Sequence, residues 1–124
     1  MRPLNAKVVS SGVTLANGDV IAADRDAKVA ARTERPAGIM VDAEPTDNPP
    51  RFYRLAVSGD TIYDTGLTSQ TIGAEIWSDG DGTYSTTRPT AGSAGDMAWL
   101  LGHITDSDAN GSYIELDIQA VPEA

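Results

Sequence analysis

The sequence contains no cysteine in 124 residues. This absence excludes a disulfide framework, thiolate zinc sites and cysteine nucleophiles together. Histidine occurs once, at His103, whereas metal centres built on imidazole normally use two or three. A serine hydrolase needs a histidine beside its nucleophile, and the chain has no Gly-x-Ser-x-Gly motif. We therefore predict that the chain has no enzymatic activity and no cofactor.

Basic residues are few, with 9 lysines and arginines against 18 acidic residues and a net charge of -9. Binding to nucleic acid depends on basic side chains that release counterions from phosphates. The densest basic neighbourhood, Lys28 to Arg35, also contains Glu34. We expect no nucleic-acid partner.

Long hydrophobic runs are also missing. No stretch approaches the roughly 18 apolar residues of a membrane span. The first 11 residues lack the apolar core of a signal peptide. The expectation is synthesis in the cytoplasm, with no membrane partner.

Aromatic residues make up only 6% of the chain. A domain of this length buries about two-thirds of its unfolded surface, so the core is expected to be thin. Such a chain gains stability when subunits bury apolar surface together. The composition is therefore consistent with an oligomer.

What the sequence does contain is turn chemistry at short intervals. Each turn combines glycine with a residue that tolerates a left-handed backbone. These turns are Asn17-Gly18-Asp19, Ser58-Gly59-Asp60, Ser78 to Gly82, Ala94-Gly95-Asp96 and Asn110-Gly111-Ser112. Short β-branched and aromatic runs lie between them, a pattern typical of an all-β sandwich or barrel. We predict one domain of short antiparallel strands at residues 13–124, preceded by an arm at residues 1–12.

The last strand has the clearest pattern, because Ile114, Leu116 and Ile118 alternate with polar residues. The Asn110-Gly111 pair predicts a hairpin between it and the preceding segment. The other expected strands are Gly38 to Asp42, Arg51 to Val57, Ile72 to Trp77, Thr83 to Thr87 and Met97 to Thr105. Gly-Asp before an apolar pair, as in Gly59-Asp60-Thr61-Ile62, indicates a turn that leads into a strand.

Two segments are harder to assign. Asp24 to Arg35 is compatible with a helix capped by Asp24, and propensity slightly favours it. The alternative is a hairpin in which Val20 to Ala23 turns at Asp24-Arg25-Asp26 and returns as Ala27 to Ala31. The segment Pro45 to Pro50 holds three prolines and predicts an exposed loop.

One segment resembles a calcium loop. Asp106, Asp108 and Asn110 stand in a D-x-D-x-N-G pattern, and hard cations prefer such clustered oxygens. An EF-hand needs a flanking helix on each side, and here strands are predicted instead. Asp-Ser-Asp and Asn-Gly are also ordinary hairpin residues. We therefore favour a turn and expect no metal site.

Several short segments resemble those of phage capsid decoration proteins. They are Asn17 to Ile21, Ala27 to Val29, Pro36 to Ala43, Val57 to Ile62, Ile72 to Trp77, Asp81 to Pro89, Leu101 to Ile104 and Tyr113 to Ile118. The similarity covers roughly residues 13–119 and consists mainly of glycine positions and β patterning. The long proline-rich loop departs from it.

The resemblance implies a compact barrel-like fold, sometimes called a β-tulip, and favours the β alternative for Asp24 to Arg35. It implies a homotrimer at threefold sites on the capsid exterior, assembled in the host cytoplasm and bound to the major capsid protein as cement for the head. Trp77 and Trp99 are then candidates for the subunit interface, where tryptophan is a common anchor.

The arm is the candidate element for capsid binding. Lys7, Val8 and Val9 can extend and pair with an exposed sheet edge, although a terminus without such a role would have the same sequence. Two other functions stay open. One is a carbohydrate-binding or adhesin-type module of a phage head fibre or tail, in which aromatic residues stack on sugars. The other is a small β-barrel enzyme whose site no motif reveals.

Overall fold

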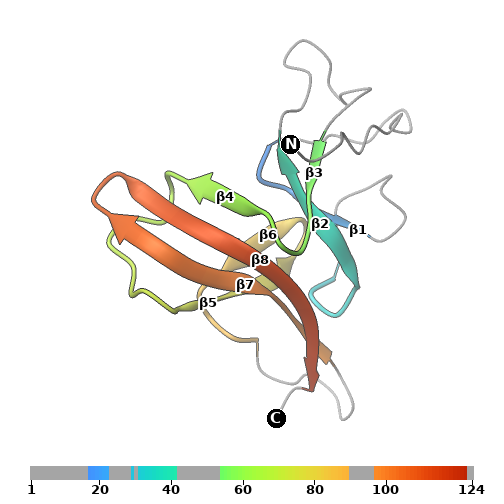
Figure 1. Ribbon diagram of the computed structural model, residues 1–124. Coiled ribbons are helices and arrows are strands. Elements are labelled where there is room, and N and C mark those ends of the chain that lie inside the picture. The colour runs from blue at the N-terminus through green and yellow to red at the C-terminus, as the bar shows by residue number, and fades with distance from the viewer. Residues whose placement is uncertain (1–16, 23–28, 30, 42–53, 90–96, 123–124) are drawn as a thin grey trace.

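The computed structural model describes residues 17–22, 29, 31–41, 54–89 and 97–122. All regular elements in these residues are β-strands, and no helix occurs among them. The larger of two antiparallel sheets curls into a half-barrel (Figure 1). The all-β, barrel-like class predicted from the spacing of the turns is confirmed.

The strands form two sheets, each built from a continuous stretch of the chain. The smaller has the order β1-β2-β3 and the larger β4-β8-β7-β5-β6. Their bounds are β1 Val20–Ala22, β2 Pro36–Val41, β3 Arg54–Ala56, β4 Thr61–Asp64, β5 Glu75–Gly80, β6 Thr83–Ser85, β7 Met97–Asp108 and β8 Gly111–Pro122. A tight turn joins the sheets, because the backbone N–H of Asp60 donates to the carbonyl of Val57 (2.9 Å) and the N–H of Val57 donates to the Asp60 carboxylate (2.9 Å).

The hairpin of β7 and β8 is the longest feature of the fold, with 12 residues in each strand. The predicted Asn-Gly hairpin is present, and β7 continues three residues beyond the expected Thr105. The Asp108 carboxylate explains the tight turn, because it accepts hydrogen bonds from the backbone N–H groups of Asn110 (2.8 Å) and Gly111 (3.2 Å). A side chain that bonds its own turn in this way holds the two strands in register.

Two irregularities in pairing bend this hairpin. The register between β7 and β8 shifts between Leu100 and Gly102 and again between Ile104 and Asp106. Bulges of this kind increase the local twist and curl a sheet. At the first of them the strands pass so closely that a Cβ on Gly102 would lie 2.1 Å from the carbonyl oxygen of Glu115.

The main core lies between the two sheets. Alternation along β8 turns Ile114 and Leu116 inward, as predicted, and leaves Glu115 and Asp117 exposed. The buried members of this cluster are Val20, Ala22, Val29, Ile39, Ala56, Ile62, Ile76, Leu101, Ile104, Ile114 and Leu116. Neighbouring residues on the small sheet form a second buried cluster of Ile21, Met40 and Leu55. Successive strand residues point to opposite faces, so both faces of the small sheet are buried.

The ambiguous segment is not helical where the structure describes it. Residues 31–34 form turns and bends, with the N–H of Glu34 donating to the carbonyl of Ala31 (3.0 Å). Propensity favoured the helix, and this alternative is wrong for these residues. The other alternative was a strand that returns from Ala27 to Ala31, and Ala31 does not belong to a strand. Val29 does pair with β1, through an N–H bond to the carbonyl of Val20 (2.9 Å). The rest of residues 23–30 lies outside the described residues, as do the arm and Pro45 to Pro50.

The strand expected at Ile72 to Trp77 begins later than predicted. It runs from Glu75 to Gly80, and Ile72 is 65% exposed. The reason is a turn at Gly73, whose φ of 90° interrupts the extended backbone. The carbonyl of Ile104 accepts the Gly73 N–H (2.7 Å) and holds this turn against β7.

Two buried serines allow a matched test of core polarity. The hydroxyl of Ser78 has no hydrogen-bond partner in the described part of the chain, whereas that of Ser112 bonds the carbonyl of Leu67 and the hydroxyl of Ser107. Removing a buried hydroxyl raises the free energy of unfolding only when that hydroxyl makes no hydrogen bond. Ser78→Ala should therefore raise the free energy of unfolding by up to about 1 kcal/mol, and Ser112→Ala should lower it by about 1–2 kcal/mol. Urea denaturation measures both, and changes of the same sign would contradict this account.

Candidate functional site

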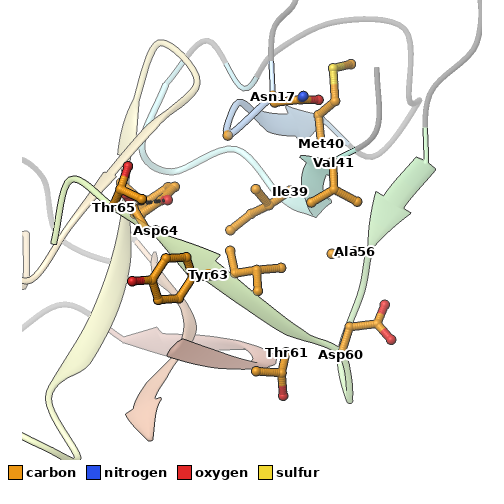
Figure 2. A pocket seen from close by; sticks show the side chains of 13 residues that line it. Asn17, Ile39, Met40, Val41, Ala56, Asp60, Thr61, Tyr63, Asp64 and Thr65 are labelled. Carbon is orange, nitrogen blue, oxygen red and sulfur yellow. Dashed lines mark hydrogen bonds between the residues drawn. The ribbon is translucent and has the colours of Figure 1, made fainter. Parts of the chain in front are cut away.

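A groove of about 530 Å³ separates β4 from the small sheet. Its apolar lining comes from Ile39 and Val41 of β2, Ala56 of β3 and Ile62 of β4. Figure 2 shows Ile39, Val41 and Ala56 opposite the strand that carries Tyr63. Asp60 and Asp64 line the two ends. The groove therefore has a mainly polar exposed lining over buried apolar side chains, with a carboxylate at each end.

One wall of this groove is the backbone of β4. Residues 61–65 all line it, and among the described strands β4 pairs only with β8. The N–H of Leu116 donates to the carbonyl of Asp60 (2.8 Å). Because antiparallel pairs alternate in the direction of their backbone groups, Ile62 and Asp64 bond toward β8. Thr61 and Tyr63 then direct their N–H and C=O groups into the groove.

Asp64 closes one end of the groove by holding two neighbouring groups. Its carboxylate accepts the hydroxyl of Tyr84 (2.5 Å) and the backbone N–H of Gly66 (2.6 Å). Burial of Tyr84, together with its hydrogen bond to the charged Asp64, strongly raises the pKa of its phenol. The Asp64 carboxylate and the Tyr84 hydroxyl therefore have a structural role, because their hydrogen bond links β4 to β6.

Because of this hydrogen bond between Tyr84 and Asp64, the free energy of unfolding should decrease at alkaline pH. A phenol whose pKa is raised by folding stays protonated in the native state, while the unfolded chain begins to ionise at its model value of 10.0. Its contribution to stability is complete below that pH and is lost as the pH rises above it. Tyr84→Phe should cost about 1–2 kcal/mol at neutral pH and make stability fall less steeply above pH 10. Urea denaturation at several pH values tests this. The exposed Tyr113→Phe is the control and should leave both quantities nearly unchanged.

The opposite face of the large sheet carries an exposed aromatic pair. Tyr63 and Tyr113 are directly opposite each other on β4 and β8, with ring centroids 4.7 Å apart and planes tilted by 51°. Each is 47% exposed. Loss of water around its phenol and the negative charge of Asp108 raise the pKa of Tyr63. The pair offers two ring surfaces in an acidic surrounding.

His103 lies on the same solvent-exposed face of the large sheet as the two tyrosines. It is half-buried in β7 and stands in register with Glu75 on one side and Glu115 on the other. Both register partners of His103 are therefore acidic residues. The arrangement is a row of polar side chains across three strands.

The calcium-like residues occupy the end of the long hairpin. Asp106 accepts the N–H of Ser107 (2.9 Å), and Asp108 accepts two turn N–H groups. Asp117, the twelfth residue counted from Asp106 and the position of the last ligand in a calcium loop, lies near the middle of β8. Within the described residues, no group of three or more histidine or acidic side chains is arranged to hold a metal ion.

We accordingly expect calcium to leave stability unchanged. Melting temperatures measured with calcium and with a chelator should agree within about 1 °C, because the oxygens of Asp108 already bond the backbone. A rise of several degrees in calcium, abolished by Asp108→Ala, would show instead that this hairpin end binds the ion.

The two tryptophans have different environments. Trp77 is 1% exposed and packs with Ala98 and Leu100 in a third core cluster, with the Arg88 guanidinium 5.1 Å from its ring centroid. Trp99 is half-buried, and its indole N–H donates to the carbonyl of Thr33 (3.0 Å). Trp99 also lines a second hollow, of about 520 Å³. Of the two interface candidates, Trp99 is the one with surface to offer a partner.

No family model matches the chain, and no curated protein matches it. No helix in the described part of the chain is long and apolar enough to cross a membrane. Lys7, Val8 and Val9, the candidates for capsid binding, lie outside the described residues.

The groove was not predicted from the sequence. One signal was available, because Asp64 follows Ile62 at a spacing of two and so shares its inward face. A carboxylate on such a face requires a polar partner. Nothing in the sequence indicated that this partner is Tyr84, 20 residues away, since the pairing depends on how β6 packs near β4.

Proposed function

We propose that this chain is a structural virion protein that binds the outer surface of a phage capsid and stabilises the head as a trimeric decoration protein. Its partners would be the major capsid protein and two further copies of itself. The observation that carries the proposal is the curled antiparallel half-barrel covered by a small sheet. The resemblance of the sequence to decoration proteins implied a compact barrel-like fold of this kind.

The surface chemistry suits a protein that acts by adhesion. A net charge of -9 favours solubility before assembly. The chain's half-buried tryptophan is a feature that neighbouring subunits can cover. None of this requires a catalytic group or a cofactor.

Two measurements test the proposal. Light scattering of the purified chain should give the mass of a trimer at micromolar concentration, or on addition of capsids if trimers form only there. Electron microscopy of particles incubated with the chain should show added density at threefold positions. A chain that stays monomeric and does not sediment with capsids lacking their native decoration protein would overturn the proposal.

The aromatic pair supports a second candidate, a carbohydrate-binding module of a phage head fibre or tail. Paired exposed tyrosines can stack on sugar rings, and neighbouring acidic side chains can accept hydrogen bonds from hydroxyl groups. Titration with a panel of glycans tests this. Binding that Tyr113→Ala abolishes and Ile72→Ala leaves intact would favour this candidate over a decoration protein.

A further inference from the structure

We propose that the groove along β4 is a strand-binding site, and that its occupant is the segment Lys7-Val8-Val9 of the same chain. The segment would lie against the open edge of β4 as an added antiparallel or parallel strand. This inference goes beyond the proposed function, and its test needs no capsid.

The first argument is the backbone of the groove. Thr61 and Tyr63 direct their N–H and C=O groups away from β8 and toward this space. An edge with such groups is a template for another strand, and natural proteins usually cover it. Ile39 and Ala56 of the lining are already buried in the core, whereas Val41 is half-buried and leaves a surface on which a β-branched side chain can bury its methyl groups.

The second argument is charge. Residues 1–16 contain Arg2 and Lys7 and none of the 18 acidic residues. The remaining residues therefore hold 7 of the 9 basic residues against all 18 acids, a net charge of -11. Both ends of the groove carry a carboxylate, Asp60 and Asp64. A basic segment is complementary in charge to a groove with acidic ends.

The third argument is chain length. The segment joins the described structure at Asn17, which itself lines the groove. Residues 10–16 between them can span up to about 23 Å when extended. That is enough to reach any part of a groove of this volume, so docking within one chain needs no second copy. The high local concentration of a tethered segment also favours its own groove over a distant one.

The absence of cysteine makes a direct test possible in the full chain. Val8→Cys and Val9→Cys are each combined with Thr61→Cys or with Tyr63→Cys, and the four variants are oxidised. Adjacent residues of a strand face opposite sides of a sheet, and Thr61 and Tyr63 share one side. One arm position should therefore cross-link efficiently, at least tenfold faster than the other, and the product should be a monomer.

Other outcomes overturn the proposal. Equal cross-linking at Val8→Cys and Val9→Cys would show a segment that samples the groove without forming a strand. Cross-linked dimers would identify a second copy as the occupant. No cross-link in any of the four variants would leave the groove to another partner and refute docking of this segment.

Hydrogen exchange gives an independent readout without cysteine. The amides of Thr61 and Tyr63 should be protected in the full chain, and Val8→Asp with Val9→Asp should speed their exchange by at least tenfold. The control, Ser10→Asp with Ser11→Asp, adds the same charge beside the segment and should change these amides much less. Amides of β8 should be unaffected by either pair. Equal exchange rates of the Thr61 amide in the Val8→Asp with Val9→Asp variant and in the Ser10→Asp with Ser11→Asp variant would refute docking.

Discussion

Replacing Gly102 with alanine should lower the free energy of unfolding by about 3 kcal/mol or more, the upper range for an overpacked site. The added Cβ would lie 2.1 Å from the carbonyl oxygen of Glu115 and 3.0 Å from the Cα of Leu116. Both obstacles are backbone atoms of the neighbouring strand, so no side-chain rotation relieves the contact. The two longest strands would have to separate where the sheet bends.

The matched control is Gly66→Ala. The nearest atom to its added Cβ is a side-chain oxygen of Asp64, at 3.1 Å. This substitution should cost less than about 1 kcal/mol, as is usual away from the core. Urea denaturation measures both variants, and similar stabilities for the two would show that β7 and β8 do not approach as closely as the structure has them.

Trp77→Ala should have the other large effect, lowering the free energy of unfolding by about 3–5 kcal/mol. Trp77 is the largest fully buried side chain and fills the space beside Ala98 and Leu100. Alanine would leave a cavity there and remove the ring beneath the Arg88 guanidinium. Because a domain of this size has only about 5–15 kcal/mol of stability, the substitution should remove a large part of it, and thermal denaturation should show a clearly lowered Tm.

Trp99→Ala is the comparison for Trp77→Ala. Its side chain is half-buried and makes one hydrogen bond, to the carbonyl of Thr33. In the single chain the substitution should cost about 1–2 kcal/mol. If Trp99 lies at a subunit interface, as expected from its exposure, Trp99→Ala should also weaken the oligomer in light scattering. A monomer mass for Trp99→Ala alongside a trimer mass for wild type would support that role, and equal masses would contradict it.

The sequence alone determined the class of the fold and its best strands. Turn residues at short intervals and the alternation of Ile114 and Leu116 with polar residues are local signals, set by the backbone preferences of glycine and by the two-residue period of a strand. The same locality explains the correct hairpin at Asn110-Gly111. Helix propensity is also a local signal, and it favoured the wrong alternative at residues 31–34, where the chain turns between Val29, which bonds Val20, and the start of β2 at Pro36.

Only the tertiary structure decided where the surfaces lie. The groove exists because β4 forms the edge of one sheet while β2 and β3 belong to another, and sequence periodicity does not encode which strands become neighbours. The order of the strands pairs Tyr63 with Tyr113, whereas the curl of the large sheet brings Tyr84 of the edge strand β6 to Asp64 of the opposite edge strand β4. The bulge at Gly102 gives the sheet its curl through contacts between backbones that are far apart in the chain. Such long-range pairing depends on the shape of the whole core, which is why local patterns predicted the strands but not the site they form.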